Sequence, residues 1–85
     1  MVTKQIKRLY CNLTPAEQKV ADYVIEFPAD VTEMTVHQLA EKCGVASSAV
    51  VRFCKAIQLQ GFSELKIALA RELGSMREAK ENDRF

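Results

Sequence analysis

The sequence predicts a small all-α domain, a bundle of about five helices. Apolar residues recur at three- and four-residue steps, the spacing of amphipathic helices, and the alternation typical of half-buried strands is absent. The few glycines and prolines, three and two of 85 residues, stand where helices are expected to begin or end. A chain of this length forms one domain and has little room for a deep pocket.

The first predicted helix spans residues 3–11, and the second spans residues 15–27. The second has a strong start signal, because Thr14 can cap it and Glu17 can accept a bond from the amide of the cap. Pro28 ends it, since proline disfavours the α conformation at the preceding residue. The predicted buried stripe of this helix comprises Val20, Ala21, Val24 and Phe27.

A connector with room for a single helical turn is predicted at residues 29–34. The third helix begins with a capping box at Thr35 and Gln38. It ends at Gly44, which readily adopts the left-handed conformation that closes a helix. A short link then leads to a fourth helix, predicted at residues 48–57.

The last helix follows a turn at residues 58–62, and Ser63 is its predicted cap. Beyond Met76 the sequence is charged and poor in apolar residues. We therefore expect a domain at residues 1–78 and a frayed or disordered tail at residues 79–85. The apolar side of this helix comprises Leu65, Ala68, Leu69, Leu73 and Met76.

The segment 36–55 has the spacing of a helix-turn-helix. Ala40 is small enough for a second helix to cross closely, and Gly44 allows the tight corner. Val50 and Phe53 are placed to pack back onto the first helix of the pair. In a helix-turn-helix the second helix lies in the major groove of DNA. The alternative is an ordinary helical hairpin within a small bundle.

The side of the fourth helix opposite its apolar stripe carries Ser48, Arg52 and Lys55, with Ser47 and Val51 near its start or flank. Small side chains at the leading turn permit close approach to a groove. Arg52 can bind guanine in a bidentate manner or hold a phosphate, and serine hydroxyls can bind either. Helix capping by the serines and a solvated Lys55 are the alternatives.

Two further residues are candidates for contact with DNA phosphate. His37 lies in the first turn of the third helix, which crosses the DNA backbone in a helix-turn-helix. Lys66 lies near the start of the last helix, close to its free amides. A surface histidine without a role and a solvated lysine are the corresponding alternatives.

The sequence has no signature of an enzyme. Its one histidine stands in no nucleophile motif, and no glycine-rich phosphate loop, carboxylate pair or metal-ligand spacing occurs, so no catalytic residue, cofactor or metal is predicted. Three cysteines without a CxxC pair indicate reduced, mostly buried thiols in a cytoplasmic protein. No apolar run approaches the ~20 residues of a membrane span.

Three segments carry a resemblance to a known family: LTPAE at 13–17, VASSAVVRFCK at 45–55 and GFSELK at 61–66. The sequence resembles, from about residue 13 to 73, the N-terminal DNA-binding domain of the RpiR family of bacterial transcription regulators. The resemblance implies a winged-helix-like or homeodomain-like domain that binds operator DNA near sugar-metabolism genes. It also implies a C-terminal sugar-isomerase-type (SIS) domain that senses phosphosugars, for which this chain is too short. Ala46 departs from the family, which usually has serine there, so the cap shifts to Ser47 or is absent.

Two functions therefore compete. The first is sequence-specific binding of double-stranded DNA as a dimer, for which the stripe of Leu65, Leu69, Leu73 and Met76 is a candidate local contact. The second is a helical protein-interaction or dimerisation module without DNA affinity. Residues 35–62 carry a formal charge of +2, which favours the first, and a whole-chain charge of +1 keeps the second open.

Overall fold

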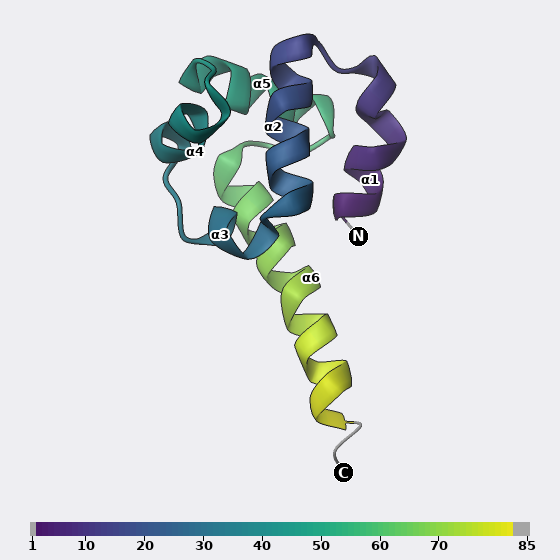
Figure 1. The fold of residues 1–85 in the computed structure, drawn as a ribbon. Coiled ribbons are helices and arrows are strands. Elements are labelled where there is room, and N and C mark those ends of the chain that lie inside the picture. The colour runs from purple at the N-terminus through teal and green to yellow at the C-terminus, as the bar shows by residue number, and fades with distance from the viewer. Residues whose placement is uncertain (1, 83–85) are drawn as a thin grey trace.

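The computed structural model describes the backbone of residues 2–82 and the side chains of residues 2–74. Over this range the chain is helical and contains no strand, which confirms the all-α prediction. Six α-helices form where about five were expected, because the connector contains a short helix of its own. In Figure 1, α2 stands at the centre, with α1 on one side and α4 on the other, and α6 extends beyond the body of the domain.

Helix α1 (Val2–Leu9) passes into a 3₁₀ turn, η1 (Tyr10–Asn12), where one continuous helix was predicted. Ile6 is its fully buried residue. The start of α1 is tied to α6 (Phe62–Asn82), since the Thr3 amide and hydroxyl donate to the two carboxylate oxygens of Glu72 at 3.2 and 2.7 Å. A carboxylate is favourable there because the amides at a helix start are unpaired.

Helix α2 (Pro15–Glu26) begins at the predicted capping box. The Glu17 amide donates to Thr14 Oγ1 at 3.2 Å, and the Thr14 amide donates to Glu17 Oε1 at 3.1 Å. Phe27 is outside the α region, as Pro28 requires, but its prediction as a buried residue is wrong. It is 41% exposed, because it lies beyond the last helical residue, and its ring packs on the ring of Tyr23.

The connector becomes α3 (Pro28–Thr32), a helix of five residues. Pro28 occupies its first position, where a missing amide proton costs nothing. Val31 is fully buried, and α3 packs mainly against α6. The single helical turn for which the predicted connector had room therefore forms, one residue earlier than its predicted start, with Val31 as its buried residue.

Helix α4 (Val36–Cys43) begins at Thr35, and its capping box with Gln38 is confirmed. Gly44 has φ 71°, which confirms the left-handed corner. The Val45 amide donates to the Ala40 carbonyl at 3.0 Å, and the Gly44 amide donates to the Glu41 carbonyl at 3.2 Å. These bonds form a Schellman motif, which ends α4 without a loop.

Helix α5 (Ser47–Ala56) ends in a second Schellman motif. The Leu59 amide donates to the Cys54 carbonyl at 2.9 Å, and the Gln58 amide donates to the Lys55 carbonyl at 3.0 Å. The left-handed residue is Gln58, with φ 72°, and it lies within the turn that was predicted at residues 58–62. This conformation costs a non-glycine residue about 1–2 kcal/mol, and both the local Schellman bonds and a hydrogen bond from Gln5 to the Gln58 side chain accompany it.

The core cluster draws residues from all six helices, including Ile6 of α1 and Val31 of α3, and it contains most of the predicted stripe of α2, namely Val20, Ala21 and Val24. Leu65 and Leu69 of α6 are fully buried, and Leu73 is half-buried. Helix α6 begins at Phe62, two residues before the position that a cap at Ser63 implies, so Ser63 lies within its first turn and is not its cap. The side chain of Met76 lies outside the described residues, and the predicted tail at residues 79–85 extends past the described backbone. Its boundary stays a prediction.

Candidate nucleic-acid interface

Helices α4 and α5 cross closely at the Gly44 corner. Val50 and Phe53 of α5 are fully buried in the same core cluster as Leu39 and Ala40 of α4, the packing that the sequence predicted. Helix α2 packs against the pair, since it contacts both α4 and α5. The arrangement is a helix-turn-helix unit, held by a core rather than by its turn alone.

The outer side of α5 forms one exposed stripe. Ser48, Val51, Arg52 and Lys55 are all exposed. Val51 and Arg52 lie three and four residues after Ser48, and Lys55 lies three residues after Arg52, so the four side chains share one side of the helix. Val51 is 36% exposed, although valine commonly lies in cores. The opposite side, with Val50, Phe53 and Cys54, is fully buried. The side of α5 that helical periodicity predicted to face outward is therefore exposed in the structure.

The start of α5 differs from the prediction. The helix begins at Ser47, not Ser48, and its N-cap residue Ala46 makes no side-chain cap. Alanine has no oxygen to offer the free amides, and Ser47 is inside the helix, so the cap is absent. Helices α2 and α4 each have a complete capping box, which makes α5 the exception among these three.

Ser47 bonds instead to the neighbouring helix. His37 Nδ1 and Ser47 Oγ are 2.8 Å apart, which makes a hydrogen bond between the first turn of α4 and the first turn of α5. The sequence suggested a DNA contact for each residue separately, and their pairing was missed. Ten residues separate them, and no local pattern of the sequence indicates the contact.

Lys66 is not joined to this cluster by any described contact. Its ammonium lies over the ring of Phe62, 5.7 Å from the centroid, in a cation–π contact within α6. The contact holds Lys66 to its own helix. Its predicted role at a phosphate stays a prediction.

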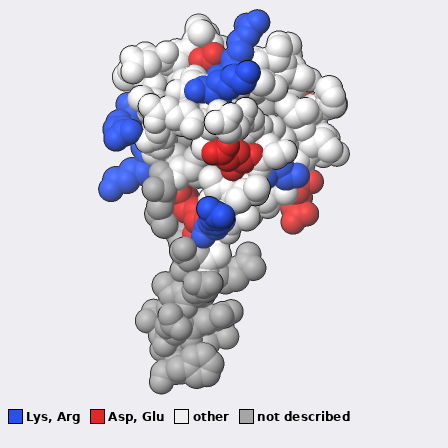
Figure 2. Space-filling model, turned by 180° about the vertical axis from the view of Figure 1, so that it is seen from behind, with Lys and Arg blue, Asp and Glu red and all other residues white. Residues whose placement is uncertain are grey.

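Basic residues do not form a continuous patch on the face seen in Figure 2. Blue and red side chains stand there in small groups among neutral ones, which agrees with a formal net charge of +1. That face therefore lacks the broad positive potential that would attract a polyanion. Any affinity for DNA must come from a local set of cations and hydrogen-bonding groups, such as the exposed stripe of α5.

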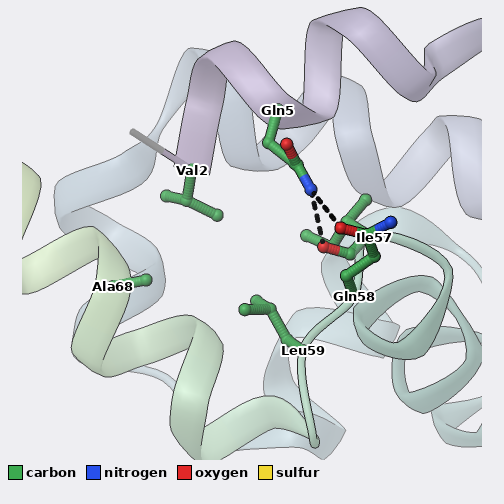
Figure 3. A pocket seen from close by; sticks show the side chains of 6 residues that line it. All are labelled: Val2, Gln5, Ile57, Gln58, Leu59 and Ala68. Carbon is green, nitrogen blue, oxygen red and sulfur yellow. Dashed lines mark hydrogen bonds between the residues drawn. The ribbon is translucent and has the colours of Figure 1, made fainter.

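A shallow pocket of ≈ 320 Å³ lies where α1, the end of α5 and α6 meet (Figure 3). The Gln5 amide nitrogen donates to Gln58 Oε1 at 3.0 Å and, at 3.5 Å, to the Ile57 carbonyl. These bonds hold Gln58, the left-handed residue that follows α5. No titratable side chain lines the pocket, so it offers no acid, base or nucleophile: its lining is Val2, Gln5, Ile57, Gln58, Leu59 and Ala68.

The cysteines differ in exposure. Cys54 is fully buried, Cys43 is half-buried and Cys11 is exposed, so the expectation of mostly buried thiols fails for Cys11. Burial raises the pKa of the Cys54 thiol to about 12 and also raises the pKa of Cys43. In the described part of the chain, no cluster of three or more His, Cys, Asp or Glu side chains could hold a metal. None of the helices described is long and apolar enough to cross a membrane.

Comparison with known proteins places this architecture in a family. Residues 1–76 match the helix-turn-helix domain of the rpiR family. The chain belongs to that family.

Individual relatives agree with this assignment. An HTH-type transcriptional regulator of Caldanaerobacter subterraneus is 43% identical over 65 residues, which is 76% of this chain and 23% of that protein. The N-terminal domain of the regulator ybbH from Bacillus subtilis superposes with a TM-score of 0.78 at 33% identity, over 81% of this chain and 84% of that one. The bifunctional protein glk of Paraburkholderia xenovorans is 35% identical over 81% of this chain and 11% of its own length. The chain thus spans less than a quarter of these two curated relatives.

Proposed function

We propose that this helix-turn-helix domain binds double-stranded operator DNA with α5 in the major groove. One observation carries the proposal. The exposed stripe of α5 presents two small or short side chains and then two cations, Arg52 and Lys55, on a helix whose other side is anchored in the core. A helix must project such a face to reach base edges.

The roles of the residues follow from their chemistry. Arg52 is suited to guanine, and the Val51 side chain is suited to a thymine methyl group. Lys55 neutralises a phosphate one turn further along the helix. Ser47 and Ser48 lie at the leading turn, where hydroxyls and free helix amides bind backbone oxygen or base edges. His37 and Lys66, at the starts of α4 and α6, complete the proposed set at its edges.

The proposal extends to the longer regulator that the family implies. The domain works in the cytoplasm as part of a dimer, because a single helix-turn-helix makes few base contacts and two-fold operators match two-fold proteins. A C-terminal SIS domain would sense a phosphosugar and control genes of sugar metabolism. The proposal assigns no catalytic step, cofactor or metal to the segment described.

The test compares Arg52→Ala and Lys55→Ala with wild type on an operator selected from random sequences and on random DNA, at several salt concentrations. Arg52→Ala should cost ~1–3 kcal/mol on the operator and remove the preference at one base position. Lys55→Ala should weaken both DNAs alike and lower the slope of log affinity against log salt by about one. Lys7→Ala is the matched control, since Lys7 is an exposed cation on α1, outside the helix-turn-helix pair α4 and α5.

The alternative is a protein-interaction module without DNA affinity. It requires that both variants bind operator and random DNA as wild type does, or that no DNA binds at low salt. Either result would withdraw α5 as the groove-reading helix. Sedimentation of the domain tests the local dimer contact separately, and a monomer at high concentration would place dimerisation elsewhere. The full burial of Leu65 and Leu69 already assigns these two to the core.

A further inference from the structure

The leading turn of α5 is anchored by a different helix. Helices α2 and α4 are capped by their own threonines, through Thr14 and Thr35. Helix α5 has no side-chain cap at Ala46, and the first side chain of the helix, Ser47, bonds to His37 of α4. The turn that leads into the proposed groove contact thus depends on a residue ten positions earlier in the chain.

We propose that His37 acts on DNA recognition through Ser47, as a positioning residue. This inference rests on the proposed function. The contact with Nδ1 holds Ser47 Oγ in one position and ties the first turns of α4 and α5 together. Ser47 is therefore preorganised before DNA arrives, and less ordering entropy is lost on binding.

The number of hydrogen-bond donors on His37 and Ser47 favours one coupled pair over two separate contacts with DNA. A neutral imidazole has one N–H donor and one acceptor nitrogen, and a serine hydroxyl has one donor. The bond between them consumes one of these two protons. Only one donor is left for DNA, whereas a phosphate offers acceptors alone. His37 and Ser47 consequently cannot act as two independent phosphate donors while the imidazole is neutral.

The decisive experiment is a double-mutant cycle for operator affinity with His37→Ala, Ser47→Ala and the double variant. Each single substitution should weaken binding by between about 2-fold and about 12-fold, the range given by one ordinary hydrogen bond. The double variant should bind the operator with the affinity of the weaker-binding single variant, because either substitution removes the same His37–Ser47 hydrogen bond. Losses that multiply would show two independent contacts and overturn the proposal.

Two companion sets define the role further. His37→Asn places an amide near the position of Nδ1 and should retain binding within about 2-fold of wild type, whereas His37→Gln places its amide near Nε2 and should resemble His37→Ala. A parallel cycle of His37→Ala with Ser48→Ala should be multiplicative, because Ser48 is the adjacent serine and has no bond to His37. Equal losses for the Asn and Gln variants would contradict action through Nδ1.

Measurements on the domain without DNA distinguish a failure of this inference from a failure of the proposed function. Thermal unfolding of the same variants reports the His37–Ser47 bond without DNA. Coupling in unfolding but not in operator affinity would leave the bond a structural contact and overturn the positioning role, with DNA binding intact. A wild-type domain that binds no DNA would overturn both proposals.

Discussion

Replacing Gly44 by alanine measures how much a side chain at the left-handed corner of the helix-turn-helix lowers the free energy of unfolding. Gly44 has φ 71°, and a Cβ built on it meets no atom within 4 Å. The substitution therefore introduces no collision with neighbouring residues. In the folded state its effect is the intrinsic penalty of a side chain in the left-handed region, about 1–2 kcal/mol.

Part of that penalty is offset in the unfolded state. Alanine restricts the unfolded chain more than glycine does, which stabilises a protein by about 0.4–1 kcal/mol where the native backbone is compatible. We expect Gly44→Ala to lower the free energy of unfolding by about 1 kcal/mol, and Gly44→Val by more, since a β-branched residue resists positive φ further. For a domain of this size, a loss of 1 kcal/mol lowers Tm by roughly 4–8 °C.

Gly61→Ala is the matched control. A Cβ at Gly61 also meets no atom within 4 Å, and its φ is not in the left-handed region. This variant should unfold at or slightly above the Tm of wild type, as followed by circular dichroism at 222 nm. A Tm for Gly44→Ala equal to that of Gly61→Ala would refute the reasoning. Gln58, which adopts φ 72° at the matching position of α5, indicates that the domain tolerates a penalty of this size.

Other outcomes follow from single features of the structure. Ala46→Ser should supply the missing cap of α5 and raise the free energy of unfolding by about 0.5–1 kcal/mol, measured by urea denaturation; no gain would show that a serine at this position does not bond to the free amides of α5. A thiol reagent at neutral pH should modify Cys11 rapidly in the folded domain and Cys54 only after unfolding, because Cys54 is buried and burial raises its pKa to about 12. The same shift predicts a loss of stability as pH rises above about 9, where the unfolded thiol ionises and the folded one does not; a flat profile between pH 9 and 11 would contradict it.

The prediction of the fold succeeded where the responsible contacts are local. A capping box joins residues three positions apart, Pro28 acts on its immediate neighbour, and Gly44 sets its own backbone angle. Such signals can be read without knowing the rest of the structure. The outward face of α5 was predictable for a related reason, since helical periodicity alone decides that Arg52 and Lys55 lie opposite Val50 and Phe53.

The errors arose where a distant partner decides the outcome. No local signal marked Gln58 as the left-handed residue after α5, and its side chain accepts a hydrogen bond from Gln5, 53 positions earlier. Phe27 kept the spacing of a buried stripe, but the backbone leaves the helix at that residue.

The sequence by itself determined that this chain is a helix-turn-helix of the rpiR family, which side of α5 faces outward and where α2 and α4 begin. Tertiary structure alone decided that Ser47 faces His37, that α5 starts without a cap and that Glu72 binds the start of α1. The difference is physical. Caps and periodicity are encoded within one or two helical turns, whereas a hydrogen bond between helices depends on how their axes cross, which the packing of the whole core sets.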